Sequence, residues 1–332
     1  MASLDASVRV GRIAGIDVEL NWSLAIVFVL IVWTLAGQVL PSVAPGQQES
    51  AYWLVSFIAV VLFYVSLLSH EMGHAIVARR LGVKVDGITL WIFGGVARLR
   101  GDAASPGSEV KIAIAGPLVS LVLAILFGVA TFALDATGGP ALVEGGIAWL
   151  AGTNAMLLLF NLIPAFPLDG GRLLRAWLWQ RSGDKYRATS GAARLGRICA
   201  FVMIGLGLLS LFINGAISGL WLIFLGWFLM SAARSEESQL LMRGALSGLL
   251  VGDVMSRDLT TARVRDLGTG LDEFAWAAPG ELVTVVLDRF SGAADGQILV
   301  IDGGELVGLL SPSDITRALL SKRPADAKRT TA

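Results

Sequence analysis

The chain has 332 residues, of which 55% are hydrophobic and 16% charged, and its 26 basic and 26 acidic residues leave no net charge. A typical soluble domain is about 45–50% apolar and about 25% charged, so this composition favours a multi-span membrane protein. Zero net charge gives no general attraction to nucleic acid, and no nucleic-acid partner is expected. The single cysteine, Cys199, excludes an internal disulfide and a cysteine-rich metal site.

Apolar stretches that are long enough to cross a bilayer follow one another through the first two thirds of the chain. Their length and apolarity predict membrane helices, and apart from Lys111, at the start of one of them, they contain no lysine or arginine. The expected spans are 20–38, 52–78, 110–134, 147–168, 198–213 and, after a short break, 216–232.

The basic residues lie on one side of these predicted spans. Arg9 and Arg12 precede the first span and further basic residues follow the second, fourth and sixth, whereas the connections 39–51, 135–146 and 214–215 contain none. Positive charge marks cytoplasmic connections. We therefore expect six spans in the plasma or inner membrane of the cell, with both termini in the cytoplasm. A signal peptide is the alternative for the N-terminus, but its apolar run exceeds the usual core of about 7–15 residues.

The stretch SLLSHEMGHAIVARR, residues 66–80, places both histidines of the chain and a glutamate in one predicted span. Residues four apart share a helix face, so His70 and His74 can point at one metal ion, and Glu71 can reach a water bound to it. This is the H-E-x-x-H arrangement of two zinc ligands and a general base. Ordinary buried histidines are the alternative, but three ionisable groups in a span are costly without a ligand. One Zn²⁺ per chain is therefore predicted.

A third zinc ligand must be an Asp, a Glu or Cys199, because the chain has no further histidine. Asp169, in the stretch NLIPAFPLDGGR, lies at the end of the fourth predicted span. The second and fourth spans run in the same direction, and His74 and Asp169 precede the next cytoplasmic arginine by five and three residues, so their depths match. A helix-end or turn residue is the alternative for Asp169, and the two histidines favour the ligand.

HEMGH in the second span and NLIPAFPLDGGR at the end of the fourth together resemble the site-2 protease family of intramembrane zinc metalloproteases, over about residues 8–232. GRIAGIDVELNWS near the start and AIAGPLVS at 113–120 are similar to the branch of that family with a C-terminal CBS region. The resemblance implies an intramembrane zinc endopeptidase that cuts a transmembrane segment of a partner protein near the cytoplasmic face. Its substrates would be membrane-bound signalling proteins, such as anti-sigma-factor-like proteins, or signal-peptide remnants.

The resemblance also assigns roles by position. His70, His74 and Asp169 match the family's zinc ligands, and Glu71 matches its catalytic base. Asn161, eight residues before Asp169, matches a family asparagine that helps to hold the substrate carbonyl.

WIFGGVARL at 91–99 resembles the family's membrane-dipping loop, which is proposed to pair with an unwound substrate. The stretch is apolar and too short to span. Gly94 and Gly95 can form a hairpin turn, and an exposed strand edge can add a peptide strand, so both glycines are predicted to bind substrate. An interfacial anchor through Trp91 and Phe93 is the alternative.

Beyond the last predicted span, 251–261 and 296–320 resemble CBS-module sequence, with two apolar strands flanking a Gly-Gly turn before a helix. Ser311 and Asp314 match a spacing that contacts the ribose of an adenine nucleotide in such modules. The alternative is a helix cap followed by a first-turn acid. The 70 residues of 251–320 suffice for one module or for a shortened pair of modules. If there is one module, its pairing needs a second chain, so a homodimer through this region is a hypothesis.

These patterns predict an α-helical polytopic membrane protein of about six transmembrane helices with a short membrane-dipping hairpin loop, followed by a small cytosolic α/β CBS-like domain. The expected parts are a membrane metalloprotease domain (1–233), a linker (234–250), a CBS-like regulatory domain (251–320) and a disordered tail (321–332). A membrane transporter or metal-ion carrier is a rival function, but it predicts polar residues through several spans, and few are present. A catalytically inactive scaffold is a third, although neither the base nor a ligand is lost.

Overall fold

The computed structural model describes residues 7–92, 94–101, 103–214, 217–246, 248–257, 275–287 and 297–321. The chain divides into two compact units, Met1–Glu237 and Ser238–Ala332. The first unit contains both motifs of the predicted metal site. Residues 322–332 of the predicted disordered tail lie outside the described residues.

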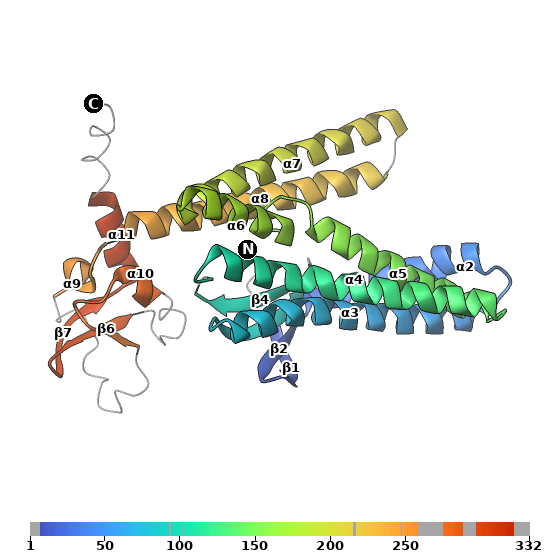
Figure 1. Ribbon diagram of the computed structural model, residues 1–332, viewed down its shortest axis with the longest axis horizontal. Helices are drawn as coiled ribbons and strands as arrows, with labels where there is room; N and C mark the ends of the chain where they lie inside the picture. The colour runs from blue at the N-terminus through green and yellow to red at the C-terminus, as the bar shows by residue number, and fades with distance from the viewer. Residues whose placement is uncertain are drawn as a thin grey trace. The chain divides into compact units, whose positions relative to one another are not determined.

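Long apolar helices make up most of the first unit (Figure 1). Helix α4 packs against both α3 and α5, and α6 packs against α4 and α7. The helices are α1 (Ser23–Thr34), the π-helical turn η2 (Leu35–Val39), α2 (Leu40–Val43), α3 (Glu49–Arg80), α4 (Pro106–Ala136), α5 (Ala141–Asn161), α6 (Asp169–Ser182), α7 (Lys185–Asn214) and α8 (Ile217–Leu246).

Within the described residues, five helical stretches are long and apolar enough to cross a membrane. They are Ser23–Val43, Glu49–Arg80, Pro106–Ala136, Ala141–Asn161 and Lys185–Ile213. The sixth predicted span corresponds to α8, where the apolar stretch Gly219–Ser235 is shorter.

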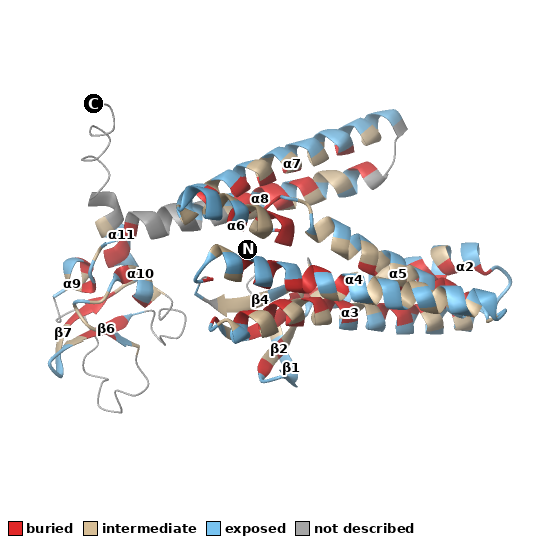
Figure 2. Cartoon of the chain, viewed as in Figure 1, coloured by how far each residue is buried: buried red, intermediate tan, exposed pale blue. Residues whose placement is uncertain are grey.

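Many residues of these helices are exposed (Figure 2), and large hydrophobic side chains are common among them. Only 17–33% of the residues in the most apolar part of each spanning helix are buried. Phe132 and Phe212, for example, expose 73% and 84% of their surface. Apolar surface on this scale is unfavourable in water, and lipid is the solvent that suits it. The chain is a multi-pass membrane protein, as the composition predicted.

Polar residues at the helix ends follow the capping and dipole rules. Helix α3 begins with Glu49 and ends with Arg79 and Arg80. A negative charge at the N-terminus and positive charges at the C-terminus interact favourably with the helix dipole. Helix α4 begins with Pro106, and the hydroxyl of Ser105 accepts a backbone hydrogen bond from its first turn. These local signals explain why both helices begin a few residues before their apolar stretches.

A four-stranded sheet packs against α3. Its strands, in spatial order, are β1 (Ser7–Ile13), β2 (Ile16–Asn21), β3 (Lys84–Trp91) and β4 (Gly94–Arg100). Strands β2 and β3 are parallel and the other pairs antiparallel. One hydrophobic cluster joins the sheet to α3: Ile16, Val18, Leu67, Met72, Ala75, Ile88 and Leu90. The sheet therefore covers the half of α3 that carries H-E-x-x-H.

Only the second hairpin of this sheet was predicted from the sequence, and the predicted position of its turn was wrong. Gly94 pairs with Trp91 and Gly95 pairs with Leu90, so both glycines belong to β4 and not to the turn. The first hairpin was missed altogether. Its turn contains Ala14 and Gly15, both with positive φ, a backbone that suits a two-residue hairpin connection.

The fourth predicted span also ends earlier than expected. Helix α5 stops at Asn161, because Pro164 and Pro167 cannot continue a helix. Asp169 does not close this span: it is the first residue of α6. The start of α6, and not the end of α5, therefore carries the predicted third ligand.

The second unit contains a small sheet with short helices. Strand β5 (Trp276–Ala277) is parallel to β6 (Ile298–Asp302), which is antiparallel to β7 (Glu305–Leu310). The helices are α9 (Val251–Val254), α10 (Val283–Val286) and α11 (Pro312–Ser321). The predicted hairpin and the helix after it are present, whereas the likeness to a CBS module stays a prediction.

Candidate metal centre

His70 and His74 lie one turn apart on α3, and both are buried. Their Nε2 atoms are 3.2 Å apart. The four-residue spacing therefore brings the two nitrogens together, as the sequence predicted.

Asp169 joins this pair from α6. Its Oδ2 atom lies 3.1 Å from His74 Nε2 and 3.3 Å from His70 Nε2. Ligand atoms at about 2.0–2.1 Å from a tetrahedral zinc ion are separated from one another by about 3.3 Å. The three side chains thus have the spacing of three corners of a zinc tetrahedron, and they form a group that can bind a metal ion.

Helix α4 contacts the Nδ1 atom of each histidine, the ring nitrogen that is not directed at the metal position. His74 Nδ1 lies 2.7 Å from the carbonyl oxygen of Ile112, and His70 Nδ1 lies 2.8 Å from the hydroxyl oxygen of Ser120. A carbonyl oxygen only accepts hydrogen bonds, so His74 Nδ1 donates and its Nε2 keeps a lone pair for a metal. Bonds of this kind fix the orientation of metal-binding imidazoles.

Two glycines allow α3 and α4 to approach at this point. A Cβ on Gly116 would overlap His74 Nε2 and lie 2.6 Å from His70 Nε2. A Cβ on Gly73 would lie 3.0 Å from the carbonyl oxygen of Ala115. The room for the two rings therefore depends on the missing side chain of Gly116.

Glu71 lies beside the start of β4. A Cβ on Gly95 would overlap Glu71 Cγ and lie 3.0 Å from its Oε1 atom. The neighbouring Gly94 has a φ of +127°, a backbone that favours glycine. The two glycines predicted to bind substrate thus begin the strand that contacts the predicted base.

The start of α6 packs closely against the turn that precedes it. A Cβ on Gly170 would overlap the carbonyl oxygens of Leu162 and Ile163, and one on Gly171 would lie 2.5 Å from the backbone of Ala165. This close packing holds Asp169, the residue before Gly170, against the turn.

Asn161 is placed at the end of α5. Its side-chain amide donates to the carbonyl oxygen of Leu157 at 3.0 Å, a bond within its own helix. Its contact with a substrate carbonyl stays a prediction.

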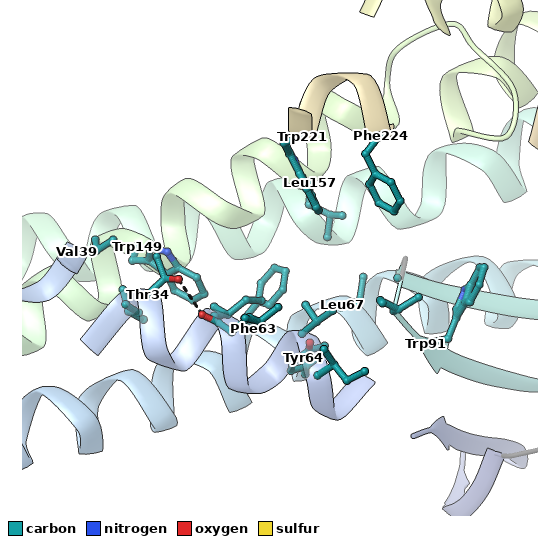
Figure 3. A pocket seen from close by; sticks show the side chains of 17 residues that line it. Thr34, Val39, Phe63, Tyr64, Leu67, Trp91, Trp149, Leu157, Trp221 and Phe224 are labelled. Atoms are coloured by element: carbon teal, nitrogen blue, oxygen red, sulfur yellow. Dashed lines mark hydrogen bonds between the residues drawn. The ribbon is translucent and has the colours of Figure 1, made fainter. Parts of the chain in front are cut away.

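An apolar cavity of about 1010 Å³ lies among α1, α3, α5 and α8 (Figure 3). Its lining includes Phe63, Leu67, Trp149 and Trp221. Trp91 and Gly94 of the β3–β4 hairpin line it as well, so the cavity reaches the hairpin that contacts Glu71.

Ser311 and Asp314 belong to the second unit. The backbone N–H of Ser311 donates to Asp314 Oδ2 at 3.0 Å, and that of Asp314 donates to Ser311 Oγ at 3.3 Å. This reciprocal pair is a capping box at the start of α11. The geometry agrees with the helix-cap alternative, and the nucleotide contact stays a prediction.

Two imidazoles and a carboxylate with zinc-like spacing, next to a glutamate and among apolar helices, define a membrane metalloprotein of the H-E-x-x-H class. Known proteins agree with this class. The family model described as "Peptidase family M50" matches residues 58–136 and 139–205.

Relatives match along most of their length. Rip3 of Mycobacterium tuberculosis, whose name assigns it to the zinc metalloproteases, is 37% identical over 94% of this chain and 93% of that protein. A Synechocystis protein with the same class name, sll0528, is 32% identical over 97% of this chain and 80% of that protein. A solved site-2 protease from Methanocaldococcus jannaschii is 33% identical, covers 70% of this chain and 95% of that chain, and has a TM-score of 0.46.

The chain belongs to peptidase family M50, the site-2 protease family. The predicted family is confirmed. The zinc prediction is confirmed as well, because the relatives are named zinc metalloproteases and His70, His74 and Asp169 form a group that can bind the ion. The branch with a CBS region stays a prediction.

Proposed function

We propose that the chain is an intramembrane zinc endopeptidase that cleaves a transmembrane segment of a membrane protein near the cytoplasmic face. The observation that carries this proposal is the convergence of His70, His74 and Asp169 beside Glu71, in helices suited to lipid. These three side chains would hold the ion, which when bound polarises a carbonyl and supplies an activated water.

Glu71 is assigned the proton transfers. Its carboxylate takes a proton from the attacking water as the new C–O bond forms at the scissile carbonyl. It returns the proton to the leaving amide nitrogen as the C–N bond breaks. Asn161 is assigned to the substrate carbonyl, on the family resemblance.

The start of β4 is assigned to the substrate backbone. A transmembrane helix has to unwind before cleavage, because its carbonyls are hydrogen-bonded within the helix. An unwound segment can pair with an exposed strand, and β4 is the outer strand of its sheet. Gly94 and Gly95 begin this strand beside Glu71, so paired substrate would lie near the base.

The apolar cavity supports the proposal that the substrate is a transmembrane segment. Aromatic and aliphatic side chains dominate its lining, which suits an apolar segment. It also borders Gly94, so a segment in the cavity could continue along β4. Anti-sigma-factor-like proteins and signal-peptide remnants are the proposed natural substrates.

The remaining proposals concern orientation and regulation. We place both termini on the cytoplasmic side of the cell membrane, because the basic residues lie in alternate connections. The second unit is proposed to be a CBS-like regulatory module that pairs in a homodimer and takes an adenine nucleotide.

Metal content and cleavage together test the function. The purified full-length protein is expected to hold about one zinc per chain by elemental analysis and to cut a single-span signal-peptide reporter in proteoliposomes. Asp169→Ala should lose zinc and cleavage, whereas Glu71→Gln should keep zinc and lose cleavage. Glu49→Gln, at the exposed start of α3, is the matched control and should retain both.

Undiminished cleavage by Glu71→Gln would refute the assigned base. Folded wild-type protein without zinc would refute the metal centre, and the protease proposal would fall with it. A transporter or scaffold would be indicated by a Glu71→Gln protein that keeps its biological activity.

A further inference from the structure

A buried ion cluster outside the ligand group joins α4 to α6. Glu109, in the first turn of α4, is 1% exposed. Its Oε1 atom lies 3.0 Å from Arg172 Nε and 2.5 Å from Arg175 Nη2. The two arginines are three residues apart on α6, so they share the helix face that meets α4. The proton transfers assigned to Glu71 make no use of this cluster.

The cluster lies on the same face of α4 as the groups that hold the histidines. Glu109, Ile112, Gly116 and Ser120 follow one another at spacings of three and four residues, which is one side of a helix. Ile112 and Ser120 bond the two imidazoles, and Gly116 leaves room for them. Glu109 is the member of this face that binds α6, the helix that carries Asp169.

We propose that Glu109 is a positioning residue for the metal centre, which holds α6 through Arg172 and Arg175 so that Asp169 meets the two histidines. The inference rests on the proposed function only in that Asp169 must bind the metal. Asp169 is three residues before Arg172, about 4.5 Å along a helix, so a displacement of α6 at the cluster moves the carboxylate as well.

A second contact ties the cluster to the turn before Asp169. The guanidinium of Arg175 lies over the ring of Phe166, 5.1 Å from its centroid. Phe166 is buried in the turn on which α6 is seated. Arg175 therefore links Glu109 to both sides of Asp169: to α6 after it and to the turn before it.

The chemistry of the cluster favours positioning over stability. Apolar residues of similar volume often stabilise a protein as well as a buried ion pair does. What charged groups add is direction, because two guanidinium groups that share one carboxylate oxygen allow few relative placements of the helices. Asp169 must place its carboxylate close to the Nε2 atoms of both histidines, so the position of α6 relative to α3 and α4 has to be restricted in this way.

Zinc affinity is the readout. The full-length protein in detergent is titrated with zinc against a chromophoric chelator. Glu109→Gln is expected to raise the zinc dissociation constant about 10–100-fold, the usual effect of removing a group that orients a metal ligand. Glu49→Gln is the matched control, because it makes the same change at an exposed helix start, and it should leave the constant unchanged.

A double-mutant cycle separates positioning from a general loss of folding. If Glu109 acts through Asp169, the variant with both Asp169→Ala and Glu109→Gln binds zinc as weakly as Asp169→Ala alone. Losses that add would overturn the inference, because Glu109 would then act independently of Asp169. Asp169→Ala with wild-type affinity would instead overturn the metal centre and the proposed function.

If the Glu109→Gln protein does not fold, a second variant, Arg172→Gln, tests the same inference. Arg172→Gln leaves one acid and one base in the cluster, so no buried carboxylate loses its only partner. It should weaken zinc binding in the same direction and show the same lack of additivity with Asp169→Ala. Wild-type affinity in a folded Arg172→Gln protein, or in a folded Glu109→Gln protein, would overturn the inference.

Discussion

Gly116 lies so close to His74 that a single additional carbon on it would overlap the imidazole Nε2 atom. Its neighbours on the same face of α4 hold the ring nitrogens that face away from the metal position, through the carbonyl of Ile112 and the hydroxyl of Ser120. Helix α4 contributes no ligand, yet it sets the position of both histidines. The site therefore depends on three helices, although its sequence motifs lie on two.

Gly116→Ala is expected to abolish tight zinc binding, because the new methyl group would occupy the space in front of both Nε2 atoms. The helix itself should not suffer, since alanine favours an α-helix over glycine by about 1 kcal/mol. Elemental analysis of the purified variant measures the effect. Gly128→Ala is the control on the same helix, where a Cβ meets nothing within 4 Å, and it should keep its zinc. Full zinc content in Gly116→Ala would show that the rings can bind metal in another position.

Ser120→Ala is expected to weaken zinc binding about 10–100-fold, because His70 loses the hydroxyl that orients its ring. A competition titration with a chelator gives the dissociation constant. Ser69→Ala offers a matched control, since the exposed Ser69 hydroxyl donates only to the carbonyl of Val65 in its own helix. Equal affinity in the Ser120→Ala and Ser69→Ala proteins would mean that the bond to His70 contributes nothing.

The ligand group could be predicted from the sequence for two separate reasons. His70 and His74 are four residues apart on one helix, so their meeting is a local property. Asp169 is distant in the chain, but the charge topology placed it at the depth of the histidines. The prediction that Asp169 closes the fourth span was wrong, because the prolines end α5 early and Asp169 begins a new helix.

Ser120 and Gly116 could not be assigned roles in the same way. Both residues lie in AIAGPLVS, a stretch that resembles the family but gave no role to either residue. What they do depends on which face of α4 packs against α3, and a helix that is apolar on every side carries no pattern that shows this. The spacing of four residues from Ile112 to Gly116 and from Gly116 to Ser120 becomes informative only once that packing is known.

The sheet was underpredicted for a related reason. Strand β1 has exposed apolar residues such as Val8 and Val10, and no strand was predicted there. The alternation in SVRVGRI and the Ala-Gly pair after it were the available signals for a hairpin. The parallel pairing of β2 with β3 joins segments separated by all of α3, and no local pattern reports such a pairing.

Gly95→Ala is expected to reduce cleavage strongly while zinc content stays unchanged. The added methyl group would overlap the side chain of Glu71, so either the base or the first residues of β4 must move. Cleavage of the single-span reporter and elemental analysis are measured on the same preparation. Gly11→Ala makes the same change in β1, where a Cβ meets nothing within 4 Å, and should have no effect on either. Normal cleavage by Gly95→Ala would argue against the assignment of Glu71 as the base.

Glu19 predicts a pH dependence of the sheet. Its carboxylate accepts a hydrogen bond from Arg98 Nη2 at 2.5 Å, which joins β2 to β4 across β3. The Arg98 hydrogen bond and charge, with help from Ser7 and Thr89, hold the pKa of Glu19 below its ordinary value of 4.5, although partial burial opposes them. The folded protein therefore binds fewer protons at Glu19 than the unfolded chain does. It follows that Glu19 stabilises the fold at neutral pH, and that this contribution is lost as the pH falls from 4.5 through the lower pKa of the folded state.

Glu19→Gln should accordingly lower the thermal midpoint in detergent near neutral pH, by about 2–4 °C for each kcal/mol lost. The difference from the wild type should shrink as the pH is lowered through the ordinary glutamate range toward about 3, because protonated Glu19 and glutamine are then equivalent in charge. Midpoints are recorded for both proteins and for Glu49→Gln at each pH. A difference that stays constant over the whole range would show that the effect of Glu19 is one of shape and not of charge, since only a charged carboxylate can lose its bond to Arg98 by taking up a proton.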